Sequence, residues 1–166
     1  MIFAIVIYAV AMTCANLSIA AFGPWVSPIN AFFLIGLDLA LRDWLHVRLR
    51  AWQMGALIAA TGLLTYGLNP AAGMIAVASS VAFTAAALVD WTTFARLRGS
   101  WLYRANGSNV AGAAVDSLLF PLLAGFPLVL VPAMFVAKVA GGAIWAWMLN
   151  PKTKAAGEIS LTSRQE

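Results

Sequence analysis

The chain has 166 residues, of which 63% are hydrophobic and only 10% are charged, far fewer charges than an ordinary soluble domain carries. A soluble fold of this length could not bury so much apolar side chain, so most of its surface must face lipid. The formal net charge of +4 forms no basic stripe along the sequence, which argues against a nucleic-acid partner, and a single cysteine excludes an internal disulfide.

Six apolar segments approach the length of about 20 residues that a membrane-spanning helix needs. They predict an all-α integral membrane domain over residues 1–150, with spans at 2–22, 29–47, 51–68, 71–95, 108–126 and 128–149. Turn-forming sequences separate four pairs of neighbouring spans: GPWVSP at 23–28, GLNP at 67–70, NG at 106–107 and FP at 126–127. Residues 151–166 are predicted to form a polar cytoplasmic tail.

The basic residues gather at every second connection. Lys and Arg occur in 42–50, 96–104 and the tail, whereas the connections at 23–28, 67–70 and 126–127 contain neither. By the positive-inside rule, this alternation predicts that both termini are cytoplasmic. Six spans also divide into two sets of three, and DWLHVRLRAW resembles DWTTFARLRGSW further along the chain. This likeness raises the hypothesis of a 3+3 inverted repeat, a common plan among transporters.

Three ionisable residues fall near the centres of predicted spans: Asp38, Asp116 and Lys138. Each would cost about 2.5–3.5 kcal/mol if it faced lipid at that depth. We therefore expect all three to point into the bundle. A buried ion pair that only fixes helix packing is the alternative, but two acids and one lysine at one depth favour a ligand site.

Polar neighbours support a ligand site at this depth. Ser108 and Asn109 share a helix face with Asp116, and Asn16 lies on the first span. Amides and carboxylates together recognise planar donor–acceptor edges such as that of a purine-like base, although a single Asn can equally bond a neighbouring helix. Asn30 and Ser27 could simply cap a helix. The substrate-binding candidates are Asn16, Asp38, Ser108, Asn109, Asp116 and Lys138.

A second charged group lies nearer the basic side of the predicted bundle. Asp38, Arg42 and His46 follow i, i+4 spacing. Two interpretations remain open: a charged helix end at the membrane surface, or an inner gate whose ion pairs open and close. The gate candidates are Arg42, Asp43, His46 and Asp90. The sequence has one His, no P-loop and no nucleophile–base spacing, so we expect no metal site, no cofactor and no enzymatic activity.

Several of these motifs resemble the queuosine precursor transporters, also described as vitamin uptake transporters. The first span carries Cys14-Ala15-Asn16 and the second carries LDLALRDWLHVRLR, with two acids five residues apart. NGSNVAGAAVDSLLF in the fifth span is the most specific match, and Lys138 followed by Asn150-Pro151 fits the last. The second acid is commonly a glutamate in that family, so Asp43 departs from its pattern.

The resemblance implies import of a 7-deazaguanine base, such as 7-cyano-7-deazaguanine or its aminomethyl form, across a bacterial inner membrane by a bacterial or phage-encoded protein. Carboxylates would then accept hydrogen bonds from the 2-aminopyrimidinone edge, and Lys138 would donate to its carbonyl or hold an acid ionised. Two alternatives stay open: a binding subunit that needs a separate ATPase to move a vitamin-like molecule, and a scaffold that transports nothing. The expected partners are a planar base and the lipid bilayer, and a homodimer is left open.

Overall fold

A computed structural model of the chain describes residues 2–46 and 48–149, without the side chains of Asp43, His46 and Ala51. All regular secondary structure in the described ranges is helical, as predicted, and the expected tail at 151–166 lies outside them. The helical segments are α1 (Ile2–Phe22), the 3₁₀ turn η1 (Pro24–Val26), α2 (Ser27–Asn30), the π-helical η2 (Ala31–Ile35), α3 (Gly36–His46), α4 (Ala51–Leu68), η3 (Pro70–Ala72), α5 (Gly73–Arg96), α6 (Trp101–Ala124), η4 (Leu128–Leu130) and α7 (Val131–Leu149).

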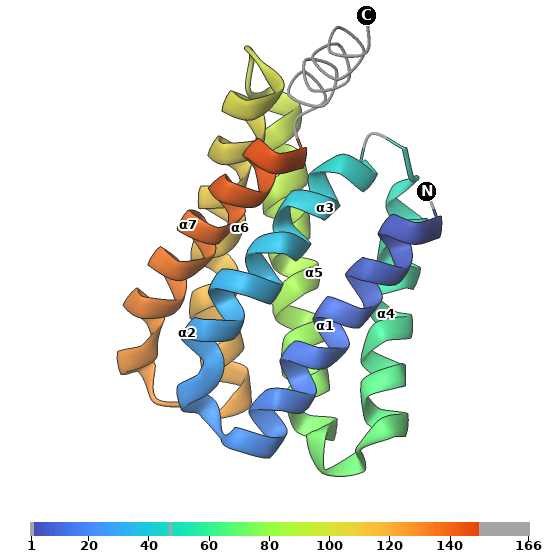
Figure 1. Cartoon of the computed structure of the whole chain (residues 1–166), viewed down its shortest axis with the longest axis vertical. Helices are drawn as coiled ribbons and strands as arrows, with labels where there is room; N and C mark the ends of the chain where they lie inside the picture. Colours follow the sequence, from blue (N-terminus) through green and yellow to red (C-terminus); the bar gives the residue numbers. More distant parts are fainter. Residues whose placement is uncertain (1, 47, 150–166) are drawn as a thin grey trace, which may run out of the picture.

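The helices run side by side and form one bundle (Figure 1). α5 packs along α6, α7 packs against α3 and α6, and α1 contacts both α3 and α4. The connections α3–α4 and α5–α6 lie at the same end of the bundle as the N-terminus, and the other three connections lie at the opposite end (Figure 1). The predicted orientation requires this alternation, while the side of the membrane on which each end lies stays a prediction.

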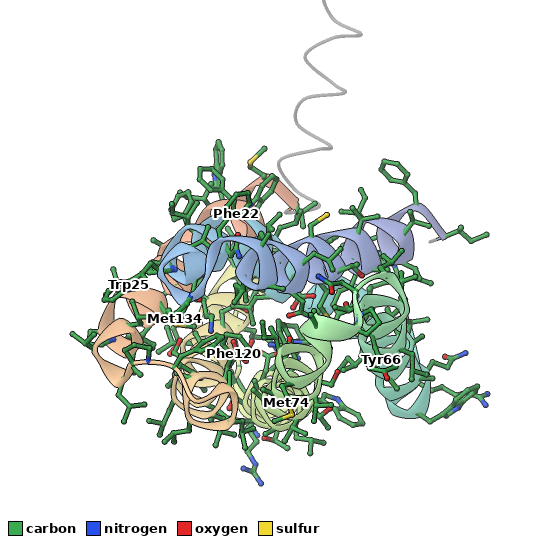
Figure 2. All side chains as sticks on the ribbon, turned by 90° about the horizontal axis from the view of Figure 1, so that it is seen from below. Phe22, Trp25, Tyr66, Met74, Phe120 and Met134 are labelled. Atoms are coloured by element: carbon green, nitrogen blue, oxygen red, sulfur yellow. The ribbon has the colours of Figure 1, made fainter. Side chains whose placement is uncertain are left out.

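The outer surface of the bundle is apolar, as expected for a chain surrounded by lipid. Phe22, Trp25, Tyr66 and Met74 lie at the perimeter and are exposed (Figure 2). By contrast, Phe120 lies between the helices and is buried (Figure 2). The hydrophobic effect cannot hold such helices together within lipid, so close packing and interior polar contacts must do so.

Within the described residues, five helical segments are both long enough and apolar enough to cross a membrane, one fewer than the six spans predicted. They are Ile2–Phe22, Pro24–Arg42, Pro70–Arg96, Trp101–Ala124 and Leu128–Leu149. α4 is not among them, although its bounds coincide with the predicted span at 51–68 and its length is about 27 Å. Gln53 lowers its hydropathy most, and Thr61 and Thr65 lower it slightly. Both are buried and donate to carbonyls of their own helix at 2.8 and 2.9 Å, so α4 hides much of its polarity.

The predicted break at 106–107 is wrong, because α6 begins at Trp101 and continues through Asn106-Gly107. The turn lies earlier, at Gly99, whose φ of +133° is a conformation that favours glycine. Ser100 then caps the helix by accepting a hydrogen bond from the backbone N–H of Tyr103 at 3.3 Å. The helix therefore starts at the cap that Ser100 provides, and Asn106-Gly107 lies within it despite the tendency of Asn-Gly to form turns.

The second predicted span starts earlier than expected and is not a regular α-helix. Helical structure begins at Pro24, after Gly23 turns the chain with a φ of +82°, and the π-helical segment η2 interrupts it. η2 and the start of α3 touch the backbone of α7. A Cβ added to Gly36 would lie 2.7 Å from the carbonyl carbon of Gly141, and one added to Gly141 would overlap the carbonyl oxygen of Phe32. Glycine is thus required on both sides of this contact.

The orientation can be tested with single cysteines in a Cys14→Ser background. We expect a membrane-impermeant maleimide to label Ala71→Cys in intact cells, because its connection carries no basic residue. Ser100→Cys should react only after the membrane is permeabilised. Permeabilised cells, in which both variants should react, control for reactivity. The reverse pattern would contradict the predicted sidedness, and labelling of both sites in intact cells would contradict a single α5 crossing between them.

The glycine contact between α3 and α7 predicts a sharp difference between two similar substitutions. Gly141→Ala should lower the melting temperature of the purified protein markedly, since its methyl group would overlap the backbone at Phe32. Gly55→Ala is the matched control, because no atom lies within 4 Å of a Cβ added there. Equal melting temperatures for the two variants, measured by intrinsic tryptophan fluorescence, would contradict the close approach.

Candidate functional site

All six substrate-binding candidates are buried, with exposed fractions between 0% and 3%. The expectation that the midplane charges Asp38, Asp116 and Lys138 point into the bundle is therefore confirmed. Burial alone does not make them ligands of a substrate, and that role stays a prediction. The six residues also do not form one continuous cluster: Asn16, Asp116 and Lys138 adjoin one cavity, whereas Ser108 and Asn109 lie elsewhere on α6 and Asp38 lies with Arg42.

A first polar group is built around an ion pair between α6 and α7. The Nζ of Lys138 donates to Oδ2 of Asp116, and the two side chains are only 1% and 5% exposed. The other carboxylate oxygen of Asp116, Oδ1, is buried and has no hydrogen-bond partner among the described residues. A buried pair of this kind keeps both charges within hydrocarbon by neutralising them, and it leaves one acceptor position unused.

A small cavity adjoins this ion pair. Its polar lining comes from five helical segments, and its volume is about 20 Å³, enough for roughly one water molecule. The polar residues that line it are Asn16, Ser27, Asn30, Ser79, Asp116 and Lys138, and the apolar ones include Phe83, Phe120 and Met134. The Nδ2 of Asn16 is buried there without a hydrogen bond in the described part of the chain. The cavity is thus too small for a planar base, which could enter only if helices separated.

Asn30 joins helices instead of capping one. Its Nδ2 donates to the carbonyl oxygen of Ala15 at 3.2 Å and to Oγ of Ser18 at 2.7 Å. These bonds tie α2 to α1 beside the cavity. Sequence reasoning treated Asn30 as a helix cap and did not identify Ser79. The only signal for Ser79 was a small polar residue within an alanine-rich span, which is too common to single out.

Two of the candidates lie along α6 but away from the cavity lining. Ser108 donates to the carbonyl oxygen of Ala105, one turn back in its own helix, at 3.1 Å. Asn109 faces α7, because a Cβ added to Gly142 would lie 3.3 Å from its Nδ2. Both amide atoms of Asn109 are buried without a hydrogen bond to another described residue. Asn109 is therefore a polar group in the α6–α7 seam that a helix movement could make available.

The second group lies closer to the arginine-rich end of the bundle. Nε of Arg42 on α3 approaches Oδ2 of Asp90 on α5 at 3.4 Å, and both side chains are at most 3% exposed. Burial of this pair favours an interior contact over a charged helix end at the membrane surface. Asp38 lies one turn before Arg42, and the charges of Arg42, Asp116 and Asp90 act on its carboxylate. The other two gate candidates, Asp43 and His46, have side chains outside the described part.

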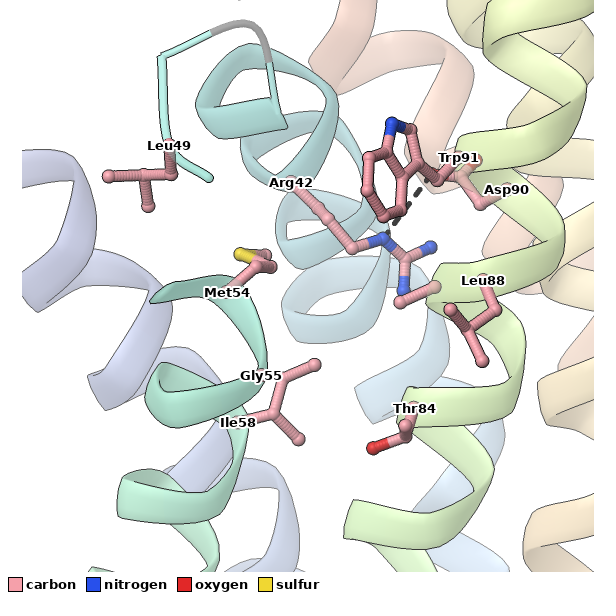
Figure 3. Close-up of a pocket in the computed structure, with 10 residues that line it drawn as sticks. Arg42, Leu49, Met54, Gly55, Ile58, Thr84, Leu88, Asp90 and Trp91 are labelled. Carbon is pink, nitrogen blue, oxygen red and sulfur yellow. Dashed lines mark ion pairs between the residues drawn. The ribbon is translucent and has the colours of Figure 1, made fainter. Parts of the chain in front are cut away.

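A larger pocket opens beside the Arg42–Asp90 pair, between α4 and α5 (Figure 3). It has a volume of about 180 Å³ and is mostly apolar, with Met54, Ile58, Leu88 and Trp91 in its lining. The guanidinium of Arg42 reaches across it towards Asp90 (Figure 3). Leu88 and Trp91 are exposed on the outer surface, so this pocket opens sideways towards lipid. Sequence reasoning did not predict a pocket here.

The Asp116–Lys138 pair can be tested by removing one or both partners. Lys138→Met or Asp116→Asn alone should destabilise the protein, by about 3–5 kcal/mol if the loss resembles that of other buried pairs, because each leaves an uncompensated buried charge. The double variant should recover part of that stability. Thermal unfolding in detergent measures all three. Single variants as stable as the unsubstituted protein would show that the two groups do not neutralise each other.

Comparison with known proteins found one family. A protein-family model described as "Putative vitamin uptake transporter" matches residues 1–155, which include both polar groups. No curated protein and no solved structure matches the chain. The match spans the whole helical bundle, and the chain belongs to the family of putative vitamin uptake transporters.

Proposed function

We propose that the protein is a secondary transporter that imports a queuosine precursor, a 7-deazaguanine base, across the inner membrane. Family membership supports a membrane transporter, and the motif around Asp116 supports this substrate class. The observation that carries the proposal is a buried carboxylate–ammonium pair bordering a small cavity whose lining includes further polar side chains. Ionisable side chains within a bilayer cost free energy, and they commonly mark a substrate or ion pathway.

The chemistry of the pair suits the edge of a 7-deazaguanine. Asp116 offers acceptor oxygens for the ring N–H and the exocyclic amine of the 2-aminopyrimidinone, and Oδ1 is already unused. Lys138 can donate to the neighbouring carbonyl of the base. The amide of Asn16 supplies a further donor and acceptor, and Phe83 and Phe120 supply apolar faces for the bicyclic ring. We assign the base-binding carboxylate to Asp116, because Asp38 is absent from the lining of this cavity.

Binding would replace a contact within the protein by contacts with the substrate. When the site is empty, Lys138 neutralises Asp116 and the cavity stays small. An incoming base would take over hydrogen bonds of Asp116 and require α7 to move relative to α3 and α6. The glycine contact at Gly36 and Gly141 supplies a smooth surface for that movement, and the π-helical η2 beside it is a type of irregularity frequent at functional sites.

The Arg42–Asp90 pair would then serve as the inner gate. It lies between the cavity and the arginine-rich end of the bundle, and it links α3 to α5. Opening at this end requires the two helices to part and the ion pair to break. Alternating access needs such a barrier on one side of a central site while the other side is open.

Uptake by purified protein in liposomes tests the proposal. We expect import of labelled 7-cyano-7-deazaguanine by the unsubstituted protein. Asp116→Asn and Lys138→Met should each lower the initial rate about tenfold or more, because hydrogen bonds to charged groups contribute about 1.5–3 kcal/mol. Thr92→Val is the matched control: Thr92 is exposed on α5 and bonds only to the carbonyl of Val89 in its own helix, so import should persist.

The same preparation separates the alternatives. Binding without uptake, seen as a shift of melting temperature with the base, would indicate a binding subunit that needs an ATPase partner. Uptake that survives both site substitutions would contradict the site assignment. Neither binding nor uptake of any 7-deazaguanine would reject this substrate class, and a panel of purines and vitamins would then identify the class that stabilises the protein.

A further inference from the structure

The buried charges of the described bundle do not balance. Three carboxylates are buried, Asp38, Asp90 and Asp116, against two basic side chains, Arg42 and Lys138. Each basic group forms an ion pair, Arg42 with Asp90 and Lys138 with Asp116. Arg42 also acts on Asp38, but one guanidinium can neutralise only one of two carboxylates. If all three acids were ionised, this interior would carry one uncompensated negative charge within hydrocarbon.

The uncompensated negative charge would lie on Asp38. Its side chain is fully buried, and neither carboxylate oxygen has a hydrogen bond of ordinary geometry to another described residue. The groups that face it are Tyr8 from α1, Arg42 from its own helix, Asp90 from α5 and Asp116 from α6, the last already held by Lys138 of α7. Tyr8 is a neutral phenol, so no further cation in the described part offsets the charge. An ionised carboxylate in such a place is far more costly than a neutral acid.

We propose that Asp38 is a proton-binding site that couples transport to the proton gradient. This inference rests on the proposed transport function. A proton from the outer side forms the O–H bond of the Asp38 carboxylic acid, and on the inner side that bond breaks and the proton leaves to water. No electron moves, and one positive charge crosses the membrane with each neutral base. A metal ion is disfavoured as the occupant, because Arg42 would repel it and the described residues contain no metal-binding cluster.

The position of Arg42 explains how the proton would act on the gate. Arg42 follows Asp38 by one helical turn, so both side chains lie on the same face of α3. When Asp38 is neutral, it does not compete with Asp90 for the guanidinium, and the α3–α5 pair is closed. When Asp38 loses its proton, it competes for the same guanidinium and weakens the hold of Asp90. Proton release would thereby loosen the inner gate.

The first test needs no substrate. Infrared difference spectra of the purified protein at neutral pH should show the C=O band of a protonated carboxylic acid that is lost in Asp38→Asn. Asp38→Glu should restore such a band, and Asp90→Asn should weaken the original band, because Arg42 can then neutralise Asp38. Absence of any acid band that depends on residue 38 in a folded protein would overturn the proposal.

The second test links the proton to transport. In liposomes, an inward proton gradient should drive accumulation of labelled 7-cyano-7-deazaguanine that a protonophore abolishes. In Asp38→Asn, the ratio of gradient-driven accumulation to exchange at equal concentrations should fall at least tenfold. An unchanged ratio would reject coupling through Asp38. No exchange by the unsubstituted protein would reject the proposed substrate, while the infrared measurement would still decide whether Asp38 holds a proton.

Discussion

The absence of water from the bilayer core is the constraint from which the rest of this structure follows. Within hydrocarbon, a charge must be neutralised by another side chain or by a proton. The bundle meets most of this demand with two interior ion pairs, one between α6 and α7 and one between α3 and α5. These pairs are also the places where a ligand or a proton could change the balance of forces. The ion pairs that neutralise the buried charges are therefore the contacts that binding of a ligand or a proton would change most.

The sequence predicted the helical class and most helix bounds, because a lipid-facing helix must be apolar over its full length. α1 and α4 begin and end at the predicted residues, and the ends of α6 and α7 lie close to theirs. The break at Asn106-Gly107 was wrong, since local turn tendency cannot reveal that Ser100 caps the helix earlier. The π-helical η2 was not predicted either; it lies against the backbone of α7, a segment distant in the sequence.

The candidate site was predictable in part for a similar reason. A charged residue in the middle of an apolar span must turn inwards, so the burial of Asp38, Asp116 and Lys138 follows from cost alone. Which of them meet depends on the rotation and depth of each helix, and hydropathy does not encode either. Asp116 forms an ion pair with Lys138, whereas Asp38 lies near Arg42. The pocket between α4 and α5 was missed because its lining is apolar and resembles any lipid-facing surface.

The backbone contact between α3 and α7 has a mechanical consequence. Where Gly36 meets Gly141 and Gly142, neither helix presents side chains that interlock with the other. Displacing one helix along its neighbour here would not require rotamers to disengage in sequence, as it does across a seam of leucines. The energy barrier to sliding these two segments past each other should accordingly be low. Lys138 could then move towards or away from Asp116 together with α7 as a rigid helix.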